Sequence, residues 1–240
     1  MRRDEVVIVQ TVAESTMQVY DPTTEDAVLL SIAESELFGR RYALGLGTRI
    51  PESLNERLRY APLAEWSPAD REALVNAIRA MHLPLVAPLL RLDLTWFDAA
   101  LDATDLPDLR TPESPEFRQL APDQRLGTLV TELRWGKDTP DGEFSGAFRH
   151  LRREFRPALL RGRPCLVAPT KEGPFTVLEG LTRLAVILAL AQAGRPSPDP
   201  VPAYVGISER LPEWGFEGDM PAAGASGGGL AGTGARNGPI

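Results

Sequence analysis

The sequence predicts an α+β fold, with a small mixed sheet packed with helices and a mostly helical extension before it. The second half of the chain gives the first observation, because its apolar pattern indicates helix, hairpin, helix and strand in that order. Helical spacing covers residues 144–159, and the later elements are expected at 164–168, 175–178, 184–193 and 201–207. The second observation is a set of helix-capping signals in the first third of the chain.

The N-terminal region, residues 1–87, is expected to be mostly helical. Residues 23–26 have the spacing of an N-terminal cap that precedes a helix. Ser67 offers a second cap, and Pro68 suits the first position of the helix that follows. The remaining expectations are a short strand at 6–9 and a loop or short strand at 40–49.

A domain core is expected over residues 88–210. Leucines that alternate with polar residues predict its first strand at 89–97. Residues 102–142 hold many prolines and charges, which indicates loops around one helix at 126–133. Residues 211–240 are rich in Gly and Ala and are expected to form a flexible tail, because they cannot bury enough apolar surface to offset the entropy of ordering.

Composition excludes several classes of site. The 240 residues contain a single cysteine, Cys165, and two histidines, so neither a disulfide framework nor a Cys- or His-based zinc site is expected. The formal net charge of −7 argues against a surface devoted to nucleic acid, although a local basic patch remains compatible with it. Because no signal peptide or membrane span is recognisable, we expect a cytoplasmic protein without a membrane partner.

The most informative segment joins an apolar strand to an apolar helix at residues 174–194. Glu179 and Gly180 form the junction, and Arg183 lies in the first helical turn. A helix begins with unpaired backbone N–H groups and the positive end of its dipole, so a glycine turn entering a helix is suited to an anion. A cation at that position opposes the dipole, so we expect a negative group beside Arg183. Glu179 or a bound phosphate would satisfy this requirement.

The run Glu179, Gly180, Leu181, Thr182 and Arg183, followed by a helix and a closing strand, resembles the motif of the ParB/sulfiredoxin-like superfamily. That motif is usually an acidic residue, Gly, any residue, His or Arg, and Arg. The resemblance covers roughly residues 88–210 and is strongest at 164–205. It implies a ParB/sulfiredoxin-like core that binds a nucleotide phosphate at this junction.

The same resemblance implies the kinds of chemistry that could occur there. ParB-type segregation proteins bind and hydrolyse CTP, sulfiredoxin uses ATP, and a branch of free-amino-acid kinases phosphorylates serine. The implied ligand is therefore a nucleoside triphosphate or diphosphate with Mg²⁺. The implied activity is that of an NTPase or a small-molecule kinase, which would also need a hydroxyl acceptor.

Three departures from the superfamily pattern narrow these expectations. Thr182 stands where His or Arg is usual, and its hydroxyl can hydrogen-bond a phosphate but cannot act as a cation. Cys165 lies on the preceding strand and not beside Arg183, so sulfiredoxin activity is not expected. A second arginine-containing motif and a helix-turn-helix are not recognisable after the core, so chromosome segregation is not expected either.

The candidate site residues follow from the motif. Glu179, Gly180, Thr182 and Arg183 are the expected nucleotide-binding residues, and Glu179 and Arg183 are also candidates for catalysis. Asp93, at the expected first strand of the core, is a candidate general base for an incoming hydroxyl. Structural alternatives stay open, because Glu179 can simply pair with Arg183 and Thr182 can simply bond to backbone.

An alternative function uses the basic patch at Arg149–Arg163, most of which lies on one face of the expected helix at 144–159. Arg149, Arg152, Arg153 and Arg156 lie largely opposite the apolar face of that helix. They would suit a nucleic-acid-binding or nuclease-type module of a plasmid, phage or defence system, although a solvated face is the simpler interpretation. A scaffold that has lost turnover because of Thr182 is a third possibility.

Overall fold

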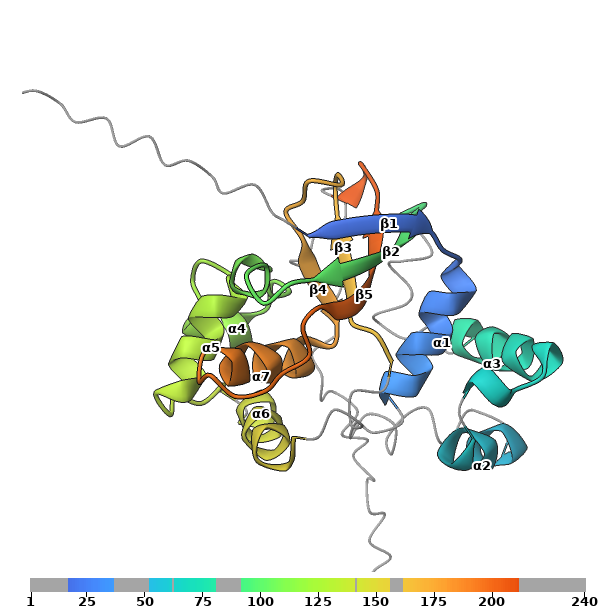
Figure 1. Ribbon diagram of the computed structural model, residues 1–240, viewed down its shortest axis with the longest axis horizontal. Helices are drawn as coiled ribbons and strands as arrows, with labels where there is room; N and C mark the ends of the chain where they lie inside the picture. Colours follow the sequence, from blue (N-terminus) through green and yellow to red (C-terminus); the bar gives the residue numbers. More distant parts are fainter. Residues whose placement is uncertain are drawn as a thin grey trace, which may run out of the picture.

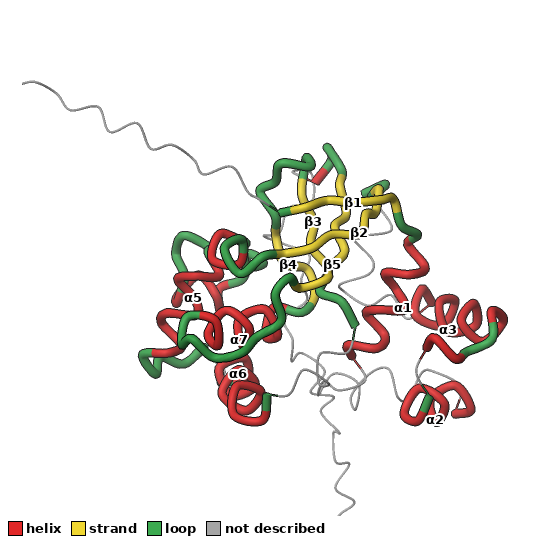
Figure 2. Tube along the Cα trace, viewed as in Figure 1, coloured by secondary structure: helices red, strands yellow, loops and turns green. Residues whose placement is uncertain are grey.

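The computed structural model describes six segments of the chain, and all structural statements concern them: residues 17–36, 52–61, 63–80, 92–140, 142–155 and 162–211. The expected strand at 6–9, the segment 40–49 and the tail from 212 lie outside these residues. Within them the chain forms one five-stranded mixed sheet with helices on both faces (Figures 1 and 2). The expected α+β class and small mixed sheet are therefore confirmed.

The sheet has the strand order β1-β2-β5-β3-β4. The neighbours β1 and β2, β2 and β5, and β3 and β4 run antiparallel, whereas β5 and β3 run parallel. The parallel pair requires a crossover, which the helix between β4 and β5 supplies. The strands are β1 (Gln18–Pro22), β2 (Thr95–Leu101), β3 (Cys165–Ala168), β4 (Thr176–Glu179) and β5 (Val201–Ile207).

One face of the sheet is covered by four helices, which lie together in Figure 1. The central one is α7, whose residues 184–190 are all buried. A helix that is apolar on every side must be covered on every side. The sheet covers α7 on one side and its neighbouring helices cover the others. The four helices are α4 (Pro115–Leu120), α5 (Leu126–Arg134), α6 (Glu143–Glu154) and α7 (Leu181–Ala191).

The opposite face of the sheet is covered by α1 (Glu25–Glu36), which belongs to two cores. Val28 and Ile32 pack against sheet residues, whereas Leu29 and Ala33 pack with α2 and α3. All four side chains are at most 1% exposed. This helix therefore connects the sheet to a small helical cluster made of α2 (Glu52–Tyr60) and α3 (Pro68–Ala80) (Figure 1).

Several local expectations are confirmed, because their signals are local. The helix at 25–36 follows the expected cap, and the Asp70 amide donates to the Ser67 hydroxyl at 3.2 Å before α3 continues. The strand at 201–207 has the expected bounds. The helix expected at 144–159 is observed as α6, although it ends at Glu154.

Other expectations require correction. The strand placed at 89–97 is observed at Thr95–Leu101, because Leu92 and Asp93 form a turn in which Asp93 has a positive φ of 49°. Residues 102–142 hold α4 as well as α5, and the signal for α4 is Ser114, whose hydroxyl accepts from the Phe117 amide.

The expected boundary at residue 88 does not separate two units. The edge strand β1 and the helix α1 come from the region that was expected to be a helical extension, yet both pack on the sheet. The N-terminal region also contains a strand as well as helices. Composition does not reveal that β1 belongs to the sheet, because β1 is short and mostly exposed and only its pairing with β2 defines it.

Gly162 lies close to α1, and this contact yields a stability prediction. Its φ is +67°, and an added Cβ would lie 2.3 Å from the Ser31 carbonyl oxygen. Gly162→Ala should therefore lower the free energy of unfolding by about 2–4 kcal/mol, through left-handed strain and overpacking. Gly194→Ala is the matched control, because Gly194 has φ +64° with nothing within 4 Å of an added Cβ. Urea denaturation measures both, and equal losses would contradict a tight Gly162–α1 contact.

Candidate functional site

The junction expected from the sequence is present, since β4 ends at Glu179 and α7 begins at Leu181. Gly180 lies between them with φ 89°, a conformation that favours glycine. A Cβ at this position would also lie 2.9 Å from Nη2 of Arg183 and 3.1 Å from Pro164. The turn and the packing around it therefore both require glycine.

Arg183 is held beside this turn by acceptors from three parts of the chain. Its Nη1 donates to the Gly162 carbonyl oxygen at 2.7 Å, and its Nη2 donates to Ser35 Oγ at 2.8 Å and to Glu179 Oε2 at 2.5 Å. The side chains of Glu179 and Arg183 are each only 11% exposed. Of the two negative groups that the sequence left open, the structure shows Glu179 in contact with Arg183.

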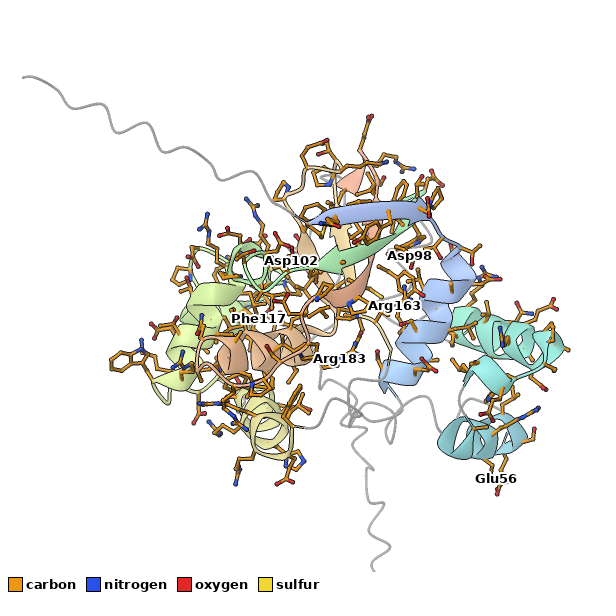
Figure 3. The ribbon with its side chains drawn as sticks, viewed as in Figure 1. Glu56, Asp98, Asp102, Phe117, Arg163 and Arg183 are labelled. Carbon is orange, nitrogen blue, oxygen red and sulfur yellow. The ribbon has the colours of Figure 1, made fainter. Side chains whose placement is uncertain are left out.

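These contacts belong to a polar row that crosses the sheet. The register pairs Asp98 with Tyr204, Tyr204 with Cys165, and Cys165 with Glu179, so four neighbouring strands each place one of these side chains on the same face. That face is the one covered by α1. Figure 3 shows Arg163 and Arg183 between the sheet and the helices, with Asp98 on β2. The row therefore lies beneath α1.

Arg163 lies at the opposite end of this row from Arg183, and like Arg183 it pairs with a carboxylate. Its guanidinium pairs with Asp98 and lies 5.0 Å from the centre of the Tyr204 ring. Its backbone amide donates to Ser31 Oγ at 2.6 Å. Ser31 and Ser35 are one helical turn apart, so one face of α1 binds the Arg163 backbone and the Arg183 side chain. Sequence reasoning did not find these two serines, because helical serines without a partner in view are usually solvated.

Cys165 lies in this row and is completely buried. Burial raises the pKa of its thiol well above the ordinary value, Glu179 raises it further, and Arg183 lowers it. The neutral thiol is therefore the stable form, as expected for a buried structural cysteine. The arrangement does not favour nucleophilic chemistry at this residue.

The first turn of α7 is the part of the junction suited to a ligand. The N-cap residue is Gly180, which has no side chain to cap the helix, and the first turn contains no acidic residue. Within the part of the chain that the structure describes, the backbone amides of Leu181 and Thr182 donate no hydrogen bond. Thr182 is partly exposed, so its hydroxyl is available to the same ligand. The arrangement provides donors and a positive dipole end for an anion.

The structure does not bring Asp93 to this junction. Asp93 precedes β2 at the end of the sheet where Ala168 and Ile207 lie, and it pairs with Arg210 at 3.0 Å. Glu179 lies at the other end of β3, with two strands between it and β2. Strand spacing of about 4.8 Å and a rise of about 3.3 Å per residue make the separation well over 10 Å. A role for Asp93 as a base at this site is therefore not supported.

The basic residues of the alternative function lie elsewhere, on α6. Phe148 faces the core and is fully buried, whereas Arg149 and Arg153 are exposed and Arg152 is partly exposed. Arg149 pairs with Asp138, and the Arg153 Nε lies 3.5 Å from the Arg149 carbonyl oxygen. The fourth residue, Arg156, lies outside the described residues. The expected division of α6 into an apolar and a basic face is confirmed.

Comparisons with known proteins do not identify a family for this chain. No family model, no curated protein and no solved structure matches the chain. Among the described residues, no group of three or more His, Cys, Asp or Glu side chains is placed to hold a metal ion. None of the described helices is both long and apolar enough to cross a membrane.

The Glu179–Arg183 pair yields a prediction about stability. Arg183→Met should lower the free energy of unfolding by about 3 kcal/mol or more, because it leaves the mostly buried Glu179 carboxylate without its cation. The double variant Glu179→Gln with Arg183→Met should recover part of that loss, as a double-mutant cycle in urea would show. Arg125→Met is the control, since the Arg125–Asp108 pair is more than half exposed and its loss should cost less than about 1 kcal/mol. Equal losses at both pairs would contradict this account.

The buried thiol yields a prediction about reactivity. Cys165 should react with a thiol reagent such as DTNB only when the protein opens, because its raised pKa keeps it protonated and burial blocks access. Native labelling should therefore stay slow even at pH 9, where a thiol at the reference pKa of 9.0 is half ionised. Protein unfolded in urea should react at once and release one equivalent of thionitrobenzoate. Rapid native labelling at pH 7 would contradict the buried assignment.

Proposed function

We propose that this protein binds the phosphate of a nucleotide at the first turn of α7. Donors would come from the backbone amides of Leu181 and Thr182 and from the Thr182 hydroxyl. The observation that carries the proposal is that this turn begins on a glycine in the left-handed conformation, which has no side chain to cap the helix, and that it contains no acidic residue. A carboxylate cap would have used the same donors, and here none does.

Arg183 has a supporting role in this proposal. Its guanidinium is bound to Glu179, Ser35 and Gly162, so its position is fixed before any ligand arrives. Its charge is balanced by Glu179, so the main attraction on a phosphate comes from the amides and the helix dipole. The resemblance of residues 179–183 to the ParB/sulfiredoxin-like motif supports a nucleotide as the source of the phosphate, by analogy alone.

If the bound phosphate is transferred, the reaction class is phosphoryl transfer by a kinase or an NTPase. Fixed donors at a helix start would stabilise the charge of the transferred group. Asp93 is not assigned as the base, because it lies at the other end of the sheet. Glu179 is the carboxylate at the junction, and it is bound to Arg183, so the residues do not form a protein-based Mg²⁺ site.

Thermal shift with ATP, ADP, CTP and GTP, each with and without Mg²⁺, tests the proposal. A nucleotide at about 100 times its Kd should stabilise the fold by about 2.7 kcal/mol, which raises Tm. Thr182→Val should weaken binding of that nucleotide about 10-fold or more, because it removes one hydrogen bond to a charged group. The unliganded Tm should hardly change, since Thr182 is partly exposed.

Thr131→Val on α5 is the matched control, because it removes an exposed helical threonine away from the junction. It should leave nucleotide affinity unchanged. Arg183→Lys keeps the positive charge but loses the forked contacts, so it should lower the Tm of the unliganded protein. Its nucleotide affinity should change little. The proposal fails if none of the nucleotides shifts Tm, or if Thr182→Val binds as tightly as the parent protein.

A further inference from the structure

Trp135 is exposed at a rigid helix end. Its side chain is 81% exposed, whereas a tryptophan usually buries most of its large apolar surface. The next residue, Gly136, has φ 86° and donates its amide to the Leu133 carbonyl oxygen at 3.2 Å. The Lys137 amide donates to the Glu132 carbonyl oxygen at 3.1 Å, which completes a Schellman cap at the end of α5. The backbone that carries the indole is therefore fixed.

Side-chain contacts hold the same segment from both sides. Before Trp135, Arg134 donates to Gln192 Oε1 at 2.8 Å, at the C-terminal end of α7. After it, Asp138 pairs with Arg149 of α6. A side chain on a fixed backbone has less freedom to lose on binding, and tryptophan is enriched among the residues that dominate interface energies. Trp135 therefore has the properties of an interface anchor.

An open hollow lies at the other end of the same helix. It has a volume of about 300 Å³ and lies between the 3₁₀ turn Leu106–Asp108 and the first turns of α5. The small residues Gly127, Thr128 and Thr131 of α5 line it. An added Cβ on Gly127 would lie 3.1 Å from Pro107, which also lines the hollow, so these two residues are closely packed. The hollow is a recess of small side chains beside a proline.

The hollow and Trp135 share the outer face of α5, which lies at the edge of the molecule in Figure 1. Gly127, Thr131 and Trp135 are spaced four residues apart, so they lie along one side of the helix. About 12 Å of helix separates Gly127 from Trp135. The other side of α5 faces the core and holds its buried residues, Leu126, Leu129, Val130 and Leu133. One exposed face therefore carries a recess at its start and a protruding ring at its end.

The two ends of this face also differ in charge. At the recess, Asp123 is exposed and forms no ion pair with a described residue, and Asp108 pairs with Arg125. At the ring, Arg134 is exposed and forms no ion pair with any residue that the structure describes. An unpaired carboxylate at one end and an unpaired cation at the other make the face complementary to a second copy of itself that runs in the opposite direction.

We propose that two copies of this chain associate through the outer faces of α5, packed antiparallel about a twofold axis. The Trp135 indole of each copy lies in the hollow of the other, and Arg134 of each copy lies at the acidic rim of that hollow. This isologous contact closes on itself, so the assembly stops at two copies. Each indole buries at most about 150–250 Å². The interface is therefore small, and we expect a weak, reversible dimer.

This inference does not depend on the proposed phosphate site. The contact between Arg134 and Gln192 places Trp135 at the C-terminal end of α7, whereas Thr182 lies in its first turn. Ten residues of helix, or about 15 Å, lie between Thr182 and Gln192. The experiments below use no nucleotide, so either proposal can fail alone.

Sedimentation velocity of the full chain, from about 1 µM to about 1 mM, tests the inference. The parent protein should convert from monomer to dimer over this range. Trp135→Ala should weaken the dimer about 30-fold or more, because it removes both anchors. Thr131→Lys should also weaken it, because a charged side chain would have to be buried beneath the indole. Both residues are exposed, so the variants should fold, which circular dichroism checks.

Mixing the two variants tests the contact itself. A Trp135→Ala copy still has an open hollow, and a Thr131→Lys copy still has its indole, so a mixed pair keeps one of the two contacts. The mixture should therefore associate more strongly than either variant alone. Tyr20→Ala and Thr95→Lys are matched controls, because each changes an exposed residue of the same kind on the sheet. Both controls should dimerise like the parent protein.

Each possible outcome decides the question. A reversible dimer that requires Trp135, and that reappears when the two variants are mixed, supports the inference. A monomer at every concentration overturns it, as does a dimer that Trp135→Ala leaves unchanged. Failure of the mixture to associate overturns the insertion of the indole into the hollow. Oligomers larger than a dimer overturn the twofold arrangement.

Discussion

The ion pair between Glu179 and Arg183 is the contact on which the rest of this structure depends. Its two side chains are only 11% exposed, and Arg183 also binds Ser35 of α1 and the Gly162 carbonyl oxygen. It therefore joins the end of β4, the first turn of α7, the segment before β3 and the helix on the opposite face of the sheet. A mostly buried ion pair is costly to desolvate, so the additional hydrogen bonds are what make this one stable.

The same contact separates structural from ligand-binding roles at the junction. A cation in a first helical turn would normally oppose the dipole, and Glu179, at the end of β4 four residues earlier, balances its charge. The Arg183 side chain is thus bound within the fold, so the donors for the proposed phosphate are the backbone amides of Leu181 and Thr182 and the Thr182 hydroxyl. In this arrangement, threonine in place of a second cation is compatible with phosphate binding, because the donors come from backbone.

Helix α1 connects the N-terminal region to the sheet. Its apolar side chains serve two cores, and its polar residues Ser31 and Ser35 bind the segments that carry Arg163 and Arg183. A shift of this helix would disturb the polar row beneath it, while the helices α4 to α7 on the other face would keep their own core. The first turn of α7 lies on the part of the fold whose core contains no residue of α2 or α3.

The sequence by itself determined the elements whose signals are local: the α+β class, the cap at Ser67, the hairpin, the apolar helix α7, the strand β5 and the Glu179-Gly180 junction. Its pattern also correctly divided α6 into an apolar and a basic face, and it identified Glu179 as one of two partners for Arg183. Only the tertiary structure decided that Glu179 contacts Arg183, that Ser35 and Gly162 join it, that Asp93 lies far from it, and that β1 belongs to the sheet. The physical reason is distance along the chain. Caps and periodicity act over a few residues, whereas Ser35 and Arg183 are 148 residues apart and meet only because α1 packs across the sheet.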